Sequence, residues 1–393
     1  MLNSIAWTVV SRYIAQGVAV LSNILLARYL GADGFGEYAL ASSVLLIGNA
    51  FSNFGMDMIL IRRLVSENCT SLLADGLWLQ LFLSVIYIAG VFIFNLFVPI
   101  PLSLKIYILA LLPLSFYSIF TIKVRAYQQM NVFSITQMLM AFFQLLAVFI
   151  LWFLREDVGK FVLLLLVSSI LVAFWGFTNH VLHITTWRFS LSSSLALLKS
   201  SSHMAVIGTL RLVYEKITVT LLPALAGLSM TGIFSSASRV MDAGKLGHFS
   251  AFTAIYPEMA RNEGFAKNLR GLRPLLGTAL LISTLLFLLA SPIVLILFGG
   301  GFLSAVPLLK ILTWIICPYV ISTYASLGLA ALGIEKPVLK SLLFALTSLL
   351  ILLVTLTLRF GLMGAAAAVL SAEMIHAALL WQQWRKHAPS KFP

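Results

Sequence analysis

Apolar segments of about 20 residues recur along this chain from one end to the other, the length at which a helix crosses a bilayer. Hydrophobic residues make up 61% of the chain and charged residues 10%, against roughly 45–50% and about 25% in soluble domains. The chain therefore cannot bury its apolar surface in one water-soluble fold. At about 33 residues for each helix with its loop, its length accommodates about twelve spans. We predict an all-α, polytopic membrane protein.

A weak repeat relates the two halves of the chain. The run from Gly31 to Ser42 matches the run from Gly227 to Ser238 in two glycines, one aromatic position and a final Ala-Ser pair. The offset is half the chain length. In membrane transporters, internal repeats of this kind mark two bundles that rock around a shared central site. The glycines predict a tight outer turn between the first helix and a second helix over residues 36–60.

The repeat predicts three parts of the chain. Residues 1–181 form an N-terminal lobe, residues 182–203 an amphipathic linker at the cytoplasmic interface, and residues 204–393 a C-terminal lobe with a short tail. With the N-terminus in the cytoplasm, about fifteen Lys and Arg residues fall in inner loops and about six in outer loops. The charge pattern therefore predicts that both termini are cytoplasmic.

Several classes of function are disfavoured by what the sequence contains. The net charge of +13 has no soluble basic domain to carry it, which argues against nucleic-acid binding. Cys69 and Cys317 lack CxxC spacing, and His180 and His183 offer only two ligands where zinc needs three or four. The glycines at 299–301 are not followed by Lys-Ser or Lys-Thr, so no phosphate-binding loop is present. We expect no metal and no cofactor.

Five basic residues fall inside the predicted spans, where a charge costs about 2.5–3.5 kcal/mol on insertion scales and should face a wet interior. They are Arg12, Arg211, Lys216, Arg239 and Lys245. Polar residues share faces with the arginines at helical spacing. Those faces carry Gln16, Asn23, Asn49, Asn53 and Asp57 in the first half, and Glu215 and Asp242 in the second.

Two interpretations of these charges remain open. Arg211 with Glu215, and Arg239 with Asp242, can be helix-internal ion pairs that neutralise each other, and Arg12 can extend to the inner interface. Alternatively, surplus guanidinium groups line a cavity that selects an anion, because their fork matches phosphate oxygens bidentately. Neighbouring amides and hydroxyls could then hydrogen-bond sugars, which suggests a phosphorylated, polar substrate.

Asp33 and Glu37, in the first outer loop, are the one arrangement that would suit a membrane glycosyltransferase, where carboxylates bind metal or activate an acceptor. Such an enzyme needs a large soluble loop to hold the acceptor, and it gives no reason for the repeat. Turn chemistry accounts better for Asp33.

Together, several motifs resemble the polysaccharide-export branch of the MOP superfamily, which includes the Wzx-type O-antigen flippases. In the first half they are Trp7, Arg12, Gln16, the run from Ala27 to Tyr38, Phe54-Gly55-Met56-Asp57 and Arg62-Arg63. In the second half they are Leu297-Phe298-Gly299, Ala330-Ala331-Leu332-Gly333 and the run from Gly361 to Ala366.

The resemblance implies two pseudo-symmetric six-helix lobes forming a V, alternating access, and a cationic cavity for the diphosphate-sugar head of an undecaprenyl carrier. The substrate-binding residues it implies, together with the polar faces, are Arg12, Gln16, Asn23, Asn49, Asn53, Arg211, Lys216 and Arg239. Arg28, Arg63 and Arg125 would guard the cavity mouths, and Asp57, Glu215 and Asp242 would bind a coupling proton or sodium ion.

We therefore expect a flippase for lipid-linked oligosaccharide, such as an O-antigen or lipopolysaccharide precursor, in a bacterial inner membrane. It would perform no chemistry and would work beside polysaccharide polymerase or assembly proteins. The alternatives are an ion-coupled exporter of drugs or small solutes from the same superfamily, and a membrane glycosyltransferase or polymerase.

Overall fold

The fold is all-helical in a computed structural model that describes residues 2–67, 70–182, 190–262, 269 and 271–387. The description does not extend to the side chains of residues 2–10, 12, 67, 191, 203 and 204. Helices account for 91% of the described residues, and the described ranges contain no strand. Two compact units divide the chain, Met1–Lys216 and Ile217–Pro393. The predicted all-α polytopic fold class is confirmed.

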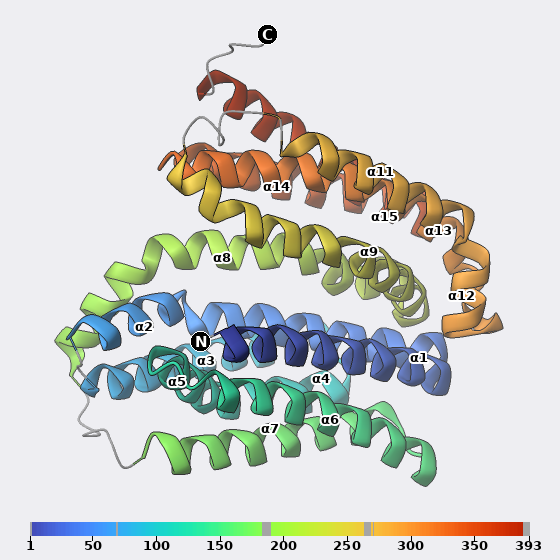
Figure 1. Cartoon of the computed structure of the whole chain (residues 1–393). Helices are drawn as coiled ribbons and strands as arrows, with labels where there is room; N and C mark the ends of the chain where they lie inside the picture. Colours follow the sequence, from blue (N-terminus) through green and yellow to red (C-terminus); the bar gives the residue numbers. More distant parts are fainter. Residues whose placement is uncertain (1, 68–69, 183–189, 263–268, 270, 388–393) are drawn as a thin grey trace. The chain divides into compact units, whose positions relative to one another are not determined.

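The first unit is built from long helices, among which α1 packs extensively against α6 and α5 against α7 (Figure 1). In order, the elements are α1 (Leu2–Asn53), α2 (Met56–Glu67), α3 (Ser71–Phe94), α4 (Leu102–Tyr107), a 3-10 turn (Ile108–Ala110), α5 (Leu111–Ala126), α6 (Met130–Leu154), α7 (Val158–His180) and α8 (Leu191–Ala226). The unit boundary falls within α8, which begins inside the predicted linker. No break therefore separates residues 191–203 from the predicted seventh helix.

The glycines of the half-length repeat share one backbone conformation. Gly31 interrupts α1 with φ 68° and ψ −171°, and Gly227 precedes α9 with φ 88° and ψ 170°. This region of φ/ψ space is essentially accessible only to glycine. The weak sequence repeat therefore corresponds to the same turn between helices in each half.

The second predicted helix ends earlier than expected. Residues 36–60 were expected to form one helix, but α1 ends at Asn53 and α2 begins at Met56. Phe54 and Gly55 between them have φ 46° and 63°, outside the helical region. As a result, Asp57 lies in the first turn of a new helix.

The second unit continues with α9 (Leu228–Arg261), α11 (Leu272–Leu288), α12 (Ala290–Phe298), a 3-10 turn (Gly300–Phe302), α13 (Ala305–Leu312), a 3-10 turn (Thr313–Ile315), α14 (Ile316–Ala331) and α15 (Lys336–His387). Helix α15 breaks at Gly361, with φ 58° and ψ −141°. A Cβ at Gly364 would overlap the Leu356 carbonyl oxygen, so the two segments of α15 approach closely at this break.

Seven helices of the described chain are long and apolar enough to cross a membrane, and the α11–α12 pair, bent by 69°, raises the number to eight. Helices α1 and α15, 52 residues each and broken at glycine, are long enough for two crossings. With the more polar α8 and α9, these account for the predicted twelve.

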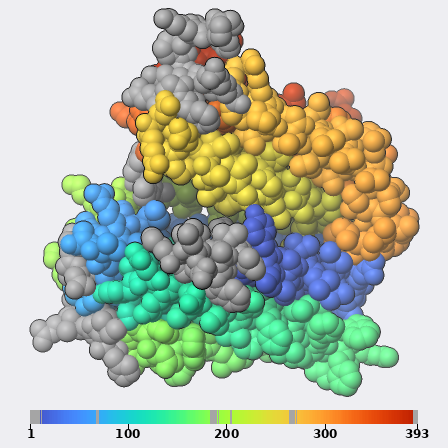
Figure 2. All heavy atoms as spheres, in the orientation of Figure 1, coloured from blue at the N-terminus to red at the C-terminus, as the bar shows by residue number. Residues whose placement is uncertain are grey.

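Helices α11 and α12 expose apolar side chains on the surface of the second unit. Their atoms, gold to orange in Figure 2, form a continuous surface in that view. Leu281, Leu288 and Ile296 on these helices are 59%, 67% and 68% exposed, as expected of a surface in contact with lipid.

Candidate functional site

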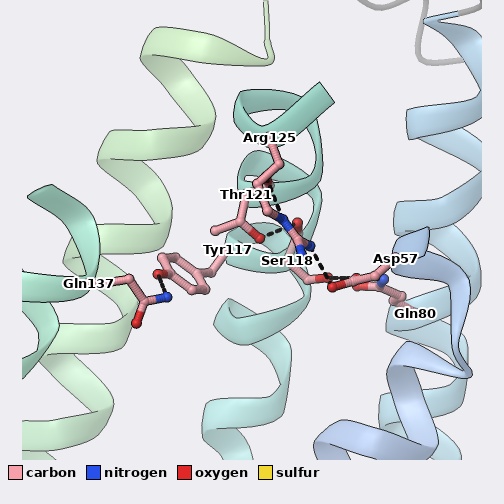
Figure 3. Close-up of polar contacts among 7 residues, drawn as sticks. All are labelled: Asp57, Gln80, Tyr117, Ser118, Thr121, Arg125 and Gln137. Carbon is pink, nitrogen blue, oxygen red and sulfur yellow. Dashed lines mark hydrogen bonds and ion pairs between the residues drawn. The ribbon is translucent and has the colours of Figure 1, made fainter. Parts of the chain in front are cut away.

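An ion pair joins two helices of the first unit. Arg125 Nη2 donates to Asp57 Oδ2 at 2.6 Å, and the two side chains are 26% and 28% exposed (Figure 3). Asp57 lies in the first turn of α2 and Arg125 in the last turn of α5, so each charge is favourable with its own helix dipole. Because both side chains retain some access to solvent, the pair is not sealed in the protein interior.

Two polar side chains extend this pair into a chain of hydrogen bonds. Ser118 donates to Asp57 Oδ1 at 3.3 Å, and Gln80 of α3 donates to Ser118 at 3.2 Å (Figure 3). Arg125 Nε also donates to the Thr121 carbonyl at 3.3 Å, and its guanidinium lies 5.8 Å from the centre of the Phe133 ring. The cluster therefore ties together α2, α3, α5 and α6.

Another side of α5 makes a polar contact with α6. Gln137 donates to the Tyr117 hydroxyl at 3.1 Å, on the side of α5 away from Asp57 (Figure 3). A partly exposed carboxylate held by a guanidinium and a hydroxyl can accept a small cation. Protonation of Asp57 would remove its charge from the pair and weaken the tie between α2 and α5.

The structure brings together residues to which the sequence assigned different roles. Asp57 was predicted as an ion-coupling residue and Arg125 as a residue at a cavity mouth, yet their side chains are directly paired. The neutralising interpretation therefore extends to Asp57, with a partner that sequence spacing did not identify.

Helix α8 carries Arg211 and Glu215, which the sequence analysis suggested as an ion pair. Arg211 Nε lies 3.4 Å from Glu215 Oε1, and the two side chains are 53% and 49% exposed. Exposed i,i+4 pairs contribute only about 0.3–0.5 kcal/mol, so this contact does not commit the guanidinium strongly. The Thr209 hydroxyl donates to the Ala50 carbonyl at 3.4 Å, which brings α8 against the part of α1 that carries Asn49 and Asn53.

Asp242 of α9 has a basic neighbour besides Arg239, the partner that the sequence suggested. Its Oδ1 lies 3.8 Å from Lys245 Nζ, which in turn lies 4.9 Å from the centre of the Tyr319 ring. Arg239, whose pairing with Asp242 stays a prediction, is half-buried on the same helix. Lys245 is therefore held by contacts within the second unit.

The other predicted site residues differ in their exposure and in their hydrogen-bond partners. The Arg12 side chain lies outside the described residues, and Gln16, Asn49, Arg63 and Lys216 are half-buried while Arg28 is exposed. Asn23 donates to the Ala19 carbonyl at 2.6 Å. The side-chain carbonyl oxygens of Asn23 and Asn53 are buried and accept no hydrogen bond from any described residue. Such atoms need a partner that the described protein does not supply.

Sequence reasoning missed several polar residues that the fold uses. The signal that could have identified Gln80 and Ser118 is their position as isolated polar residues in apolar helices. Glu373 of α15 gave a stronger signal, an acid within a span, which is a functional candidate by default. It is 7% exposed, accepts a hydrogen bond from Ser322 at 2.9 Å and lies 4.0 Å from His376 Nδ1.

Glu37 and Asp33, the carboxylates that would suit a glycosyltransferase, lie where the fold itself accounts for them. Glu37 accepts a hydrogen bond from the Ser103 hydroxyl of α4, within the first unit, and Asp33 is exposed beside the turn at Gly31. Among the described residues, no group of three or more His, Cys, Asp or Glu side chains is placed to hold a metal ion.

The arrangement of helices is that of a multi-pass membrane transporter. An inward-facing multidrug resistance MATE transporter of the MOP superfamily aligns with a TM-score of 0.76 at 15% identity, over 97% of this chain and 98% of that one. The lipid II flippase MurJ, in an inward closed conformation, aligns with a TM-score of 0.77 at 16% identity, over 96% and 87%. A MOP superfamily transporter from Pyrococcus furiosus Vc1, described as having a binding pocket of reverse polarity, aligns with a TM-score of 0.66 at 12% identity, over 98% and 94%. At these identities the likeness concerns the fold.

The family follows from the sequence itself. A family model described as "Polysaccharide biosynthesis protein" matches residues 1–263, and the chain therefore belongs to this family, within the MOP superfamily. No curated protein sequence matches the chain. The resemblance to the polysaccharide-export branch is confirmed at the level of the family, and the family and its structural relatives are transporters rather than enzymes.

Proposed function

We propose that this protein is a flippase that moves undecaprenyl-diphosphate-linked oligosaccharide across a bacterial inner membrane by alternating access. The observation that carries the proposal is the match of residues 1–263 to the polysaccharide biosynthesis family, on a fold shared with a lipid II flippase. Polysaccharide assembly needs a lipid-linked, phosphorylated sugar on the far side of the membrane. Polysaccharide polymerase or other assembly proteins would then be its partners.

Basic residues within the spans would hold the diphosphate. Arg211 is half-exposed on α8, and its pairing with Glu215 is too weak to prevent exchange for a doubly charged ligand. A guanidinium contacts phosphate oxygens through two parallel hydrogen bonds. A diphosphate also carries more negative charge than the single Glu215 carboxylate. Arg12, Lys216 and Arg239 would contribute to the same cationic site, with residues 1–181 and 204–393 as the two lobes around it.

The amide side chains of α1 would contact the sugars. Asn23 and Asn53 each have a buried side-chain oxygen without a described partner, and Gln16 and Asn49 are half-buried on the same helix. Sugar hydroxyls donate to such oxygens. This supports a polar, hydroxyl-rich substrate rather than an apolar one.

Coupling to an ion would involve Asp57. Its carboxylate is 28% exposed and accepts hydrogen bonds from Arg125 and Ser118, so a proton or sodium ion that reaches it competes with a defined pair. Glu215 and Asp242, each beside a basic residue, would be secondary candidates. In this proposal, release of the α2–α5 pair accompanies the change of access.

Reconstitution in liposomes tests the proposal. A fluorescent oligosaccharide on polyprenyl diphosphate is incorporated into both leaflets, and a membrane-impermeant quencher then reports its exposure without nucleotide. We expect the protein to give complete quenching, whereas protein-free vesicles stop at about half because lipid flip without a protein is slow. Quenching that stops at the protein-free level would contradict the flippase.

Each alternative has its own signature in the same experiment. A multidrug or small-solute exporter, suggested by the fold shared with a MATE transporter, would move cationic dyes along an ion gradient but leave the lipid in place. A glycosyltransferase or polymerase would yield a new glycosidic product from the labelled lipid, detected by mass.

A further inference from the structure

A small cavity lies between the two ends of α15, within the second unit. Because the helix turns back at Gly361, its first turns come next to its last, and the cavity between them has a volume of about 340 Å³. Lys336, Lys340 and Ser341 line it from the first segment, and Gln383 from the second. This volume lies in the usual range of small-molecule sites.

The polar groups of this cavity have no protein partner in the described chain. Neither lysine is in an ion pair with a described residue, and both are exposed. Ser341 is only 5% exposed, and no described residue hydrogen-bonds its hydroxyl, not even the preceding helical turn. A hydroxyl at the wall of a cavity can hydrogen-bond a ligand or water that enters it. Two lysines beside it select for an anion.

The rest of the lining is apolar and partly exposed. Phe344 lines the cavity and is 57% exposed, its neighbour Leu343 is 44% exposed, and Leu379 closes the opposite wall. A free phosphate would leave this apolar surface uncovered. A molecule with a phosphate at one end and hydrocarbon at the other would match both parts.

The C-terminal end of α15, which contributes Gln383 to the cavity, is also rich in basic residues. Arg385 and Lys386 lie in the last turn of the helix, close in sequence to Gln383. The preference of Lys and Arg for the cytoplasmic side puts this end at the inner headgroup region. Basic pockets between helices at that depth bind anionic lipid headgroups.

We propose that this cavity binds an anionic phospholipid of the cytoplasmic leaflet. Lys336 and Lys340 contact the phosphate, Ser341 and Gln383 hydrogen-bond the headgroup, and an acyl chain lies along Phe344. None of its lining residues is one of those proposed above to hold the transported lipid, so the two proposals concern different sites. It anchors the α15 hairpin to the inner leaflet whether or not the protein is a flippase.

Native mass spectrometry of the purified full chain tests this site. Phosphatidylglycerol is added at increasing concentration, with phosphatidylcholine as the zwitterionic comparison, and adducts are counted. We expect a preference for phosphatidylglycerol that Lys336→Gln/Lys340→Gln weakens about 30-fold, since each lysine near an anionic surface contributes roughly a factor of five. Arg385→Gln/Lys386→Gln, which removes two charges at the same end outside the cavity, is the matched control and should keep most of the preference.

Two further variants guard against a simple folding defect. Lys336→Arg/Lys340→Arg keeps the charge and should retain the adduct, and Ser341→Leu keeps both lysines but fills the cavity and should lose it. Equal loss in the Arg385/Lys386 control would mean a diffuse surface effect and would overturn the site. So would unchanged adducts in the Lys336/Lys340 glutamine variant, equal binding of phosphatidylcholine, or binding of polyprenyl diphosphate in preference to phosphatidylglycerol.

Discussion

Charged residues of this protein are stabilised in different ways according to where their partners come from. Arg211–Glu215 and Asp242–Lys245 are pairs within one helix, and each has an exposed member. Asp57–Arg125 instead joins two helices and is surrounded by Ser118 and Gln80. The first kind can exchange partners at little cost, whereas the second also contributes to the stability of its unit.

The Asp57–Arg125 pair makes a prediction about stability. Replacing Arg125 by Ala leaves the carboxylate with Ser118 only and should lower the free energy of unfolding by about 1.5–3 kcal/mol, the range for hydrogen bonds to charged groups. Lys160→Ala is the control, because its pair with Glu156 is 59% and 30% exposed and should contribute about 0–1 kcal/mol. Denaturant unfolding of the purified protein in detergent measures both. Equal losses in the two variants would show that the inter-helix pair has no special role.

The arginines within the spans make a prediction about transport. Arg211→Ala should lower lipid movement in the liposome assay by about tenfold or more, as expected for losing a charge-assisted hydrogen bond to phosphate. Arg211→Lys should recover only part of it, because the bidentate fork is lost. Arg12→Ala should behave in the same way as Arg211→Ala.

Arg359 provides the matched control for these variants. It is an exposed arginine at the end of a helical segment, with its guanidinium 5.7 Å from the centre of the Phe360 ring. Arg359→Ala should transport normally at equal expression. If Arg12→Ala and Arg211→Ala also transport normally, the hypothesis that these guanidinium groups select an anionic substrate is wrong.

At the scale of elements, glycine turns decide how the long helices fold. Gly31 and Gly227 have positive φ with ψ near 180°, and Gly361 breaks α15 in a similar way. Without these turns, α1 and α15 would be continuous rods too long for one crossing of a bilayer. A single backbone conformation thus converts each apolar stretch into a hairpin of two spans.

Substitution of Gly31 tests this role directly. Gly31→Ala should lower the free energy of unfolding by about 1–3 kcal/mol, because other residues pay that cost in this region of φ/ψ space. Gly17→Ala is the control, since Gly17 is helical and a Cβ there would meet nothing within 4 Å. It should be neutral or stabilising by roughly 0.5–1 kcal/mol. A Gly31→Ala variant as stable as wild type would show that the turn tolerates a side chain.

At the scale of the whole molecule, the distribution of charge predicts the orientation in the membrane. Phe97, 81% exposed between α3 and α4, is predicted to lie in an outer loop, and Gln129, exposed between α5 and α6, is predicted to lie in an inner loop. In a variant lacking Cys69 and Cys317, Phe97→Cys should react with a membrane-impermeant maleimide in spheroplasts, and Gln129→Cys only after permeabilisation. The reverse pattern would invert the topology and put both termini outside.

Much of the fold was accessible from the sequence because it depends on local patterns. Apolar segment lengths predicted the helices, and the repeated glycines predicted the turn at Gly31. The boundary near Phe54 was missed, since a positive φ at a non-glycine residue has no clear sequence signal. Residues of the candidate site were predicted individually, but Gln80 and Ser118 were not, because their roles depend on contacts between helices.

By itself, the amino-acid sequence determined that this chain spans a membrane as helices, that its halves are related, and that its spans contain more bases than acids. Those properties follow from composition and periodicity, which each segment carries independently of the others. Only the tertiary structure decided that Asp57 pairs with Arg125 and that Lys336 and Gln383 line one cavity. Such contacts join residues far apart in the chain, and packing of helices, rather than spacing along one helix, brings them together.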